Sequence, residues 1–135
     1  MSSTSDNTVS GAGPLAGVRI IDLTTVVMGP FASQILADLG ADVIKVESPD
    51  GDTVRNIGPS RSTGMGPMYL ALNRNKRSIA LDLRNPDGLA ALKRLIADAD
   101  VLLFNIRPDS DDVAIHLLAK QDGKPVGFAR LLILG

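Results

Sequence analysis

The sequence predicts an α/β protein built on a parallel sheet, and three observations support that prediction. Short apolar runs rich in β-branched residues, typical of buried strands, occur at residues 18–23, 41–47 and 101–105. Segments with helical spacing of apolar residues separate strands of this kind, and a helix is the usual connection between two parallel strands. Hydrophobic residues make up 44% of the chain but aromatic residues only 3%, so an aliphatic core is expected.

The first strand–helix–strand unit spans residues 18–47. Its first strand is followed by a Thr pair and then by the string GPFASQILADLG. Pro30 suits a first helical turn, where its missing N–H would be unpaired anyway, Gly29 is a candidate cap, and Gly40 can close the helix. Apolar residues recur there at helical spacing, namely Phe31, Ile35 and Leu39. A βαβ unit is therefore predicted.

A second unit follows a long loop. Residues 48–68 are rich in Gly, Pro, Ser and Asp, a composition that suits a functional loop or simple disorder, and MYLALN after it suits a short helix or a turn. RSIALDL predicts a strand. NPDGLAALKRLIADAD predicts a helix with Asn85 as N-cap and Pro86 in its first turn, and VLLFN predicts the next strand.

The composition of the chain changes near Asp109. The string VAIHLLAKQDGKPVGFARLLIL predicts a β-hairpin, because Asp122-Gly123 is a strong tight-turn signal between two β-rich runs. His116 is interpreted as a side chain of that sheet. The expected organisation is a disordered tail over residues 1–13, an α/β region over residues 14–108 and a divergent hairpin over residues 109–135.

Composition excludes several classes of protein. The formal net charge of −1 over 135 residues argues against a general nucleic-acid or membrane-surface binder. The N-terminal string MSSTSDNTVSGAG lacks the apolar core and basic residues of a signal peptide, and no apolar run approaches the ~20 residues of a membrane span. Cysteine is absent and there is one histidine, so no metal site is predicted. We expect a cytoplasmic protein.

Three strings carry a resemblance to a known family. PLAGVRIIDLTTVVMGPFASQILADLGADVIKVE, NRNKRSIALDLRNPDG and ADADVLLFNIRP resemble, in this order and with similar gaps, the N-terminal region of the family III CoA-transferases (the CaiB/BaiF group). That group includes formyl-CoA and carnitine CoA-transferases and α-methylacyl-CoA racemases. The resemblance runs from about Pro14 to Pro108. It implies a Rossmann-like core that binds CoA or acyl-CoA, no metal, and an interlocked homodimer.

The resemblance also implies a set of cofactor-binding residues. The turn TVVMGP is similar to the family's turn beside the thioester end of CoA, which would place Val27 and Met28 there. The strand end ALDLR is similar to the adenine-side wall, with Leu81 and Arg84 flanking the base. The implied set is completed by two residues that match an Asn-Phe pair lining the cofactor channel, Asn105 and Ile106.

The basic stretch NRNKRS, residues 73–78, has two interpretations. CoA carries a 3′-phosphate and a pyrophosphate, so it needs cations and free backbone N–H groups, and a helix N-terminus supplies the latter. Arg84 can stack on adenine or bind a phosphate. Without the resemblance, however, Arg74, Lys76 and Arg77 favour a solvated or bracing loop, and VVMGP favours core packing.

Three carboxylates close strands of the predicted sheet. Asp22 and Asp82 end strands, where side chains face the ligand crevice of α/β sheets, so a catalytic role is possible in principle. The favoured interpretation is that each fixes the following turn by side-chain hydrogen bonds. Glu47 is a weaker candidate for binding a ribose hydroxyl.

The chain departs from the family pattern at two places. Family transferases use an aspartate nucleophile that forms a mixed anhydride and then an aspartyl-CoA thioester, and racemases use acid–base residues; both lie beyond the matched stretch. We therefore expect a protein truncated before the nucleophile and inactive alone. Ser48 stands where many relatives carry an arginine, which predicts weaker CoA binding. The tail HLLAKQDGKPVGFARLL faintly resembles the central hairpin of GNAT-type N-acetyltransferases.

Three functions follow as hypotheses. The chain is a truncated CoA-transferase family protein acting on acyl-CoA and carboxylic acids, or a fragment of a racemase-type member. Alternatively, it is a non-enzymatic CoA-binding or partner-subunit module. A product without function is the third hypothesis. Because half of an interlocked dimer exposes apolar faces and strand edges, we expect self-association or association with a homologous chain.

Overall fold

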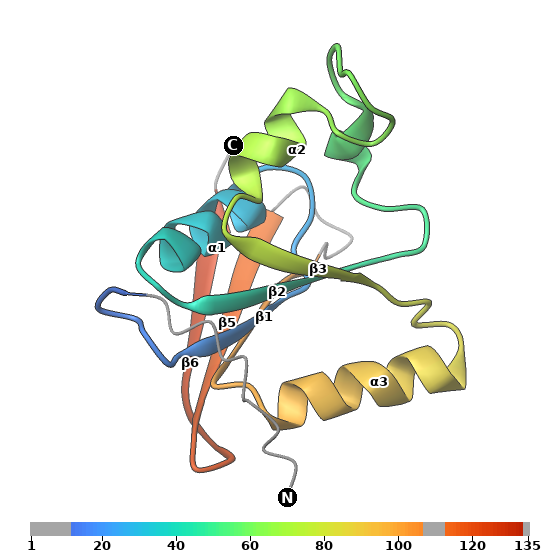
Figure 1. Cartoon of the computed structure of the whole chain (residues 1–135). Coiled ribbons are helices and arrows are strands. Elements are labelled where there is room, and N and C mark those ends of the chain that lie inside the picture. Colours follow the sequence, from blue (N-terminus) through green and yellow to red (C-terminus); the bar gives the residue numbers. More distant parts are fainter. Residues whose placement is uncertain (1–11, 107–112, 134–135) are drawn as a thin grey trace, which may run out of the picture.

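The computed structural model describes residues 12–106 and 113–133, which form one six-stranded mixed sheet with helices (Figure 1). The strands are β1 (Arg19–Asp22), β2 (Asp42–Glu47), β3 (Lys76–Ala80), β4 (Val101–Ile106), β5 (Val113–Gln121) and β6 (Lys124–Ile133). The helices are α1 (Met28–Asp38), α2 (Pro67–Leu72) and α3 (Pro86–Ala97), with a 3₁₀ turn, η1, at Thr53–Asn56. No helix in these residues is long and apolar enough to cross a bilayer.

The strand order is β3-β2-β1-β4-β5-β6. Strand β1 pairs in parallel with β2 and β4, and β2 pairs in parallel with β3. The order β3-β2-β1-β4 is the one found at the start of dinucleotide-binding α/β sheets. The predicted fold class, a parallel βαβ core followed by a hairpin, is confirmed.

Two aliphatic clusters form the core, one on each face of the sheet. Helices α1 and α3 cover opposite faces (Figure 1). Successive residues of a strand point to opposite faces, and accordingly Ile20 packs with Ala37 of α1, whereas Ile21 packs with Leu92 of α3. The strands buried on both faces read as continuous apolar runs for this reason.

Helix α1 forms where predicted, but its fully buried residues are not the large apolar ones. Phe31, Ile35 and Leu39 lie 40 to 45% exposed. The buried residues of α1 are Gly29, Pro30, Ser33, Gln34 and Ala37. Gly29 is not the cap, because the helix begins at Met28 after Val27. Gly29 lies within the first turn, where a Cβ would stand 2.3 Å from the Cβ of Thr24, so this position requires a residue without a side chain.

The predicted hairpin is also confirmed. Asp122 and Gly123 have φ values of 51° and 73°, the left-handed pair that a two-residue type I′ turn requires. Strand β5 pairs antiparallel with β4 from Val101 to Ile106, so the hairpin extends the same sheet. Residues 1–11 and the side chain of His116 lie outside the described residues, and the predictions made for them stay predictions.

Candidate functional site

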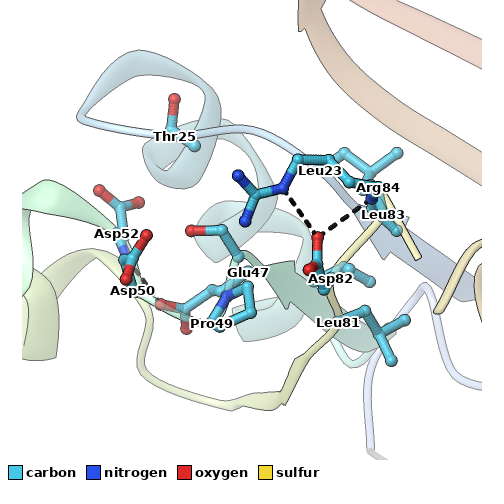
Figure 2. A pocket seen from close by; sticks show the side chains of 13 residues that line it. Leu23, Thr25, Glu47, Pro49, Asp50, Asp52, Leu81, Asp82, Leu83 and Arg84 are labelled. Carbon is cyan, nitrogen blue, oxygen red and sulfur yellow. Dashed lines mark hydrogen bonds and ion pairs between the residues drawn. The ribbon is translucent and has the colours of Figure 1, made fainter.

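A pocket of about 380 Å³ opens at the carboxyl ends of three parallel strands (Figure 2). In open α/β sheets ligands bind in the crevice outside these strand ends. The end of β1 contributes Leu23 and Thr25, β2 and its following loop contribute Glu47, Ser48, Asp50 and Asp52, and the segment after β3 contributes Leu81, Asp82 and Arg84. The chain's topology therefore brings three separate sequence segments into one site.

Arg84 is the cation that lines this pocket. Its side chain is 86% exposed, and its guanidinium Nε donates to the Asp82 carboxylate at 3.1 Å. Figure 2 shows the guanidinium extending into the middle of the pocket-lining side chains. The hydrogen bond from Arg84 lowers the pKa of Asp82, and the same bond raises the pKa of Arg84. An exposed pair of this kind is held weakly, so Arg84 can exchange Asp82 for a ligand.

Glu47 anchors the opposite wall. Its carboxylate accepts hydrogen bonds from Arg55 at 2.7 Å, Tyr69 at 2.8 Å and Ser78 at 2.7 Å, and from the backbone N–H of Asp52 at 2.8 Å. Burial raises the pKa of Glu47, but the hydrogen bonds outweigh it and bring the pKa down to about 2. Both oxygens are thus engaged by the protein, and the ribose role considered for Glu47 has no free acceptor.

Arg55 ties the long loop to the sheet. Its guanidinium lies 3.7 Å from the centre of the Tyr69 ring and also donates to the backbone carbonyl of Gly64 at 3.2 Å. Burial, and then the hydrogen bond to Glu47, raise the pKa of Tyr69 to about 12. Because Arg55 joins β2, α2 and the loop between them, it shapes the segment that forms one wall of the pocket.

A buried ion pair lies behind that wall. The Nζ of Lys45 is 3.0 Å from the Asp52 carboxylate and donates to the Thr24 carbonyl at 2.9 Å. The two charged side chains are 1% and 0% exposed. Asp52 also caps η1 by accepting from the N–H of Val54. The loop after β2 is therefore fixed to the turn after β1.

The basic stretch NRNKRS braces the fold rather than the pocket. The side chain of Lys76 is buried, and its Nζ contacts Asp22 at 3.2 Å, Ser33 at 2.8 Å and the Pro30 carbonyl at 2.8 Å. Arg74 pairs with Asp38 and Arg77 with Asp42, both at 2.6 Å. None of the three cations lines the pocket of Figure 2. Of the two interpretations left open by the sequence, the structure supports the bracing one.

The turn-fixing roles predicted for Asp22 and Asp82 are confirmed, although β3 ends at Ala80, two residues before Asp82. Asp22 is fully buried and accepts from the N–H of Thr24 at 2.9 Å. Asp82 accepts from the N–H of Arg84 at 3.1 Å. Each carboxylate thus closes an Asx turn two residues long.

The structure brings together only part of the predicted cofactor set. Leu81 and Arg84 line the pocket. Val27 and Met28 are exposed at the start of α1, and Asn105 is half-buried near the end of β4; these three do not line it. Ile106 closes β4, and its side chain lies outside the described residues. Within the described residues no group of three or more His, Cys, Asp or Glu side chains could hold a metal ion.

Sequence reasoning missed the cluster formed by Glu47, Arg55 and Tyr69. Of these residues only Arg55 lies in the stretch interpreted as a Gly-rich loop, residues 48–68. Glu47 ends the predicted strand before that loop, and Tyr69 belongs to the string MYLALN after it. One local signal was available, because Asp52 followed by Thr53 is typical of a helix N-terminus. No local pattern predicts that Arg55 then folds back onto the end of β2.

Comparison with known proteins places this geometry in a family. The model of CoA-transferase family III matches residues 15–115. The β subunit of succinyl-CoA–L-malate CoA-transferase from Chloroflexus aurantiacus is 47% identical over 96 residues, which cover 70% of this chain and 24% of that protein. Human succinyl-CoA:glutarate CoA-transferase is 44% identical, over 78% of this chain and 27% of its own length.

A solved structure agrees with these matches. A CaiB/BaiF family protein from Brucella suis superposes with a TM-score of 0.66 at 44% sequence identity, over 70% of this chain and 26% of that one. The chain thus spans about a quarter of the length of these relatives. The resemblance carried by residues 14–108 is confirmed: the chain belongs to CoA-transferase family III.

Proposed function

We propose that this chain binds coenzyme A or an acyl-CoA through the pocket at the carboxyl ends of β1, β2 and β3. The observation that carries the proposal is the position of Leu81 and Arg84, which project from the segment after β3 into that pocket. Leu81 offers an apolar wall to a base, and the planar guanidinium of Arg84 can stack on a ring or pair with a phosphate.

The remaining charges of the pocket make Arg84 decisive for this ligand. Glu47, Asp50, Asp52 and Asp82 are acidic residues of its lining. The charges of Glu47 and Asp52 are compensated by the ion pairs with Arg55 and Lys45. Ser48 also lies in the lining, so the position where many relatives carry an arginine adds no positive charge here. We therefore propose that the affinity for CoA is lower than in relatives that carry the arginine.

The reaction we propose for the family fold is transfer of CoA between an acyl-CoA and a carboxylic acid, because the relatives named above are succinyl-CoA-dependent CoA-transferases. We propose that this chain alone does not complete that reaction. A carboxylate nucleophile must reach the thioester, whereas Asp22, Glu47 and Asp52 are buried and hydrogen-bonded. The other two carboxylates of the pocket, Asp50 and Asp82, are not buried, but they interact with Arg84, at the end proposed to hold the base and not the thioester. Val27, Met28, Asn105 and Ile106 remain proposed cofactor contacts.

Calorimetric titration of CoA into the purified chain tests the binding proposal. We expect saturable binding that weakens about tenfold in Arg84→Ala, since a charge-assisted hydrogen bond or stacking contact is lost. Arg94→Ala is the matched control, because this exposed arginine lies in the last turn of α3 and outside the pocket. Its affinity should stay within about twofold of wild type. A folded chain that does not bind CoA would contradict the proposal.

A non-enzymatic partner module is the second candidate, and it is favoured by the exposed apolar face of α1 (Phe31, Ile35, Leu39). Relatives of the chain include α and β subunits of one CoA-transferase. We propose that the chain self-associates or joins a homologous chain, because such an apolar face favours association.

Light scattering of the purified chain at micromolar concentration tests this association. It should show a mass above that of the monomer, and a monodisperse monomer would contradict the proposal. Transfer of CoA from an acyl-CoA to a free acid by the chain alone would contradict the partner role.

A further inference from the structure

One residue of the turn between β1 and α1 has an unfavourable backbone conformation. Val26 has a φ of 70°. A side chain in this left-handed region crowds the backbone, and a β-branched residue is especially unfavourable there. Val26 is 43% exposed, so little apolar burial compensates for the conformation. Contacts made by its backbone must hold it.

The contact that holds it comes from Asp52. The N–H of Val26 is shared between the two carboxylate oxygens of Asp52, each at 3.3 Å. The Nζ of Lys45 donates to the same carboxylate at 3.0 Å and also to the carbonyl of Thr24, two residues before Val26, at 2.9 Å. The buried Lys45–Asp52 pair therefore binds the turn through the N–H of Val26 and the carbonyl of Thr24.

The same aspartate belongs to the pocket. Asp52 is part of the pocket lining, and its own N–H donates to Glu47 at 2.8 Å. A change in the loop after β2 therefore moves the group that holds Val26. The pocket wall and the turn that leads into α1 are joined through one buried side chain.

We propose that Asp52, with Lys45 as its counter-ion, is a positioning residue for CoA binding. It holds Val26 in the left-handed conformation and thereby sets the path of the turn that carries Val27 and Met28, the proposed contacts near the thioester. This inference rests on the proposed function, since CoA is the ligand positioned. Asp52 itself transfers no proton and forms no bond to the ligand.

The test is a mutant cycle in the full chain, read as CoA affinity by calorimetry at a temperature at which every variant is folded. Asp52→Asn should weaken CoA binding about tenfold, equivalent to about 1.4 kcal/mol. Val26→Gly should bind within about twofold of wild type. Asp52→Asn/Val26→Gly should recover most of the loss, because glycine adopts the left-handed conformation without crowding.

Ile57→Gly is the matched control for the rescue. Ile57 is β-branched and exposed like Val26 and lies outside the pocket lining, but its φ is −91°. Glycine therefore relieves no crowding there, and Asp52→Asn/Ile57→Gly should bind no better than Asp52→Asn. Wild-type affinity in Asp52→Asn would overturn the proposal. Equal weakening in Asp52→Asn and Asp52→Asn/Val26→Gly would also overturn it, because the loss would then come from the missing charge alone.

Two further measurements keep the outcome decisive. If Asp52→Asn does not fold, the cycle is run in Lys45→Met/Asp52→Asn, which buries neither charge, with the same rescue expected. If the folded wild-type chain does not bind CoA, the proposed function is wrong, and the positioning of CoA is overturned with it. The same cycle read as free energies of unfolding then decides separately whether Asp52 holds Val26: an absence of coupling between the two substitutions would show that it does not.

Discussion

Substituting Lys76 with methionine should lower the free energy of unfolding by about 3–5 kcal/mol, the cost of removing one partner of a buried ion pair. The Lys76 side chain is 1% exposed and the Asp22 side chain 0%. Without the ammonium, Asp22 remains buried with a negative charge and no cation. The carbonyl of Pro30 and the side chain of Asn73 also lose a donor. Urea denaturation at neutral pH measures the loss.

Two neighbours in the same basic stretch are the controls. Arg74→Met and Arg77→Met remove the same charge, but these side chains are 57% and 59% exposed, and exposed ion pairs contribute little. Both variants should denature close to wild type. The double variant Lys76→Met/Asp22→Asn should recover part of the Lys76→Met loss, since no charge is then buried unpaired. A loss in Lys76→Met no larger than in Arg74→Met would contradict a buried pair.

Glu47→Gln should destabilise the chain by about 3 kcal/mol at neutral pH. This magnitude follows from the pKa of Glu47, which is about 2 in the folded chain and 4.5 without its contacts, because a pKa difference of one between the folded and unfolded chain corresponds to about 1.4 kcal/mol. Glutamine keeps the shape of the side chain but not the charge that binds Arg55. Asp50→Asn, an exposed carboxylate on the loop after β2, is the control and should change stability by less than about 0.5 kcal/mol.

The pH dependence gives this prediction a second readout. The folded-state pKa of Glu47 lies below the unfolded-state value, so its contribution to stability is complete above about pH 4.5 and is lost as the pH falls toward about 2. Other carboxylates with lowered pKa values, such as Asp42, add to the loss in both proteins. Over this range wild type should therefore lose about 3 kcal/mol more than Glu47→Gln. Parallel losses would mean that the ion pair with Arg55 does not hold the Glu47 charge.

The elements of the fold were predictable because their signals are local. The N-cap at Asn85 is one example: its side chain accepts from the N–H of Asp87 at 2.9 Å, a contact between residues two apart. The turn at Asp122-Gly123 is another, since the residue types themselves favour left-handed φ. Helix α1 was predictable as a helix, but the exposed positions of Phe31, Ile35 and Leu39 were not, because Ser33 and Ala37 take the sheet-facing side.

The candidate site was predictable in part for a similar reason. Leu81 and Arg84 follow a strand, and the carboxyl ends of parallel strands meet at one edge of the sheet. The charges behind the pocket were not predictable, since basic residues close together in the sequence differ in burial. Lys76 is buried among α1 and β1, whereas Arg74 and Arg77, on either side of it in NRNKRS, remain exposed. That difference depends on the register of β3 against β2.

By itself the sequence determined the α/β class, the order of strands and helices, the hairpin and the family, because these depend on residue types at short spacing and on strings that persist in related chains. Only the tertiary structure decided which charges are buried and paired. Lys45 meets Asp52, Glu47 meets Arg55, and Lys76 meets Asp22 across 54 positions of sequence. Such pairs form only when a sheet brings separate strand ends together and excludes water from them. Neither the approach of the strand ends nor the exclusion of water can be predicted from one segment of the sequence.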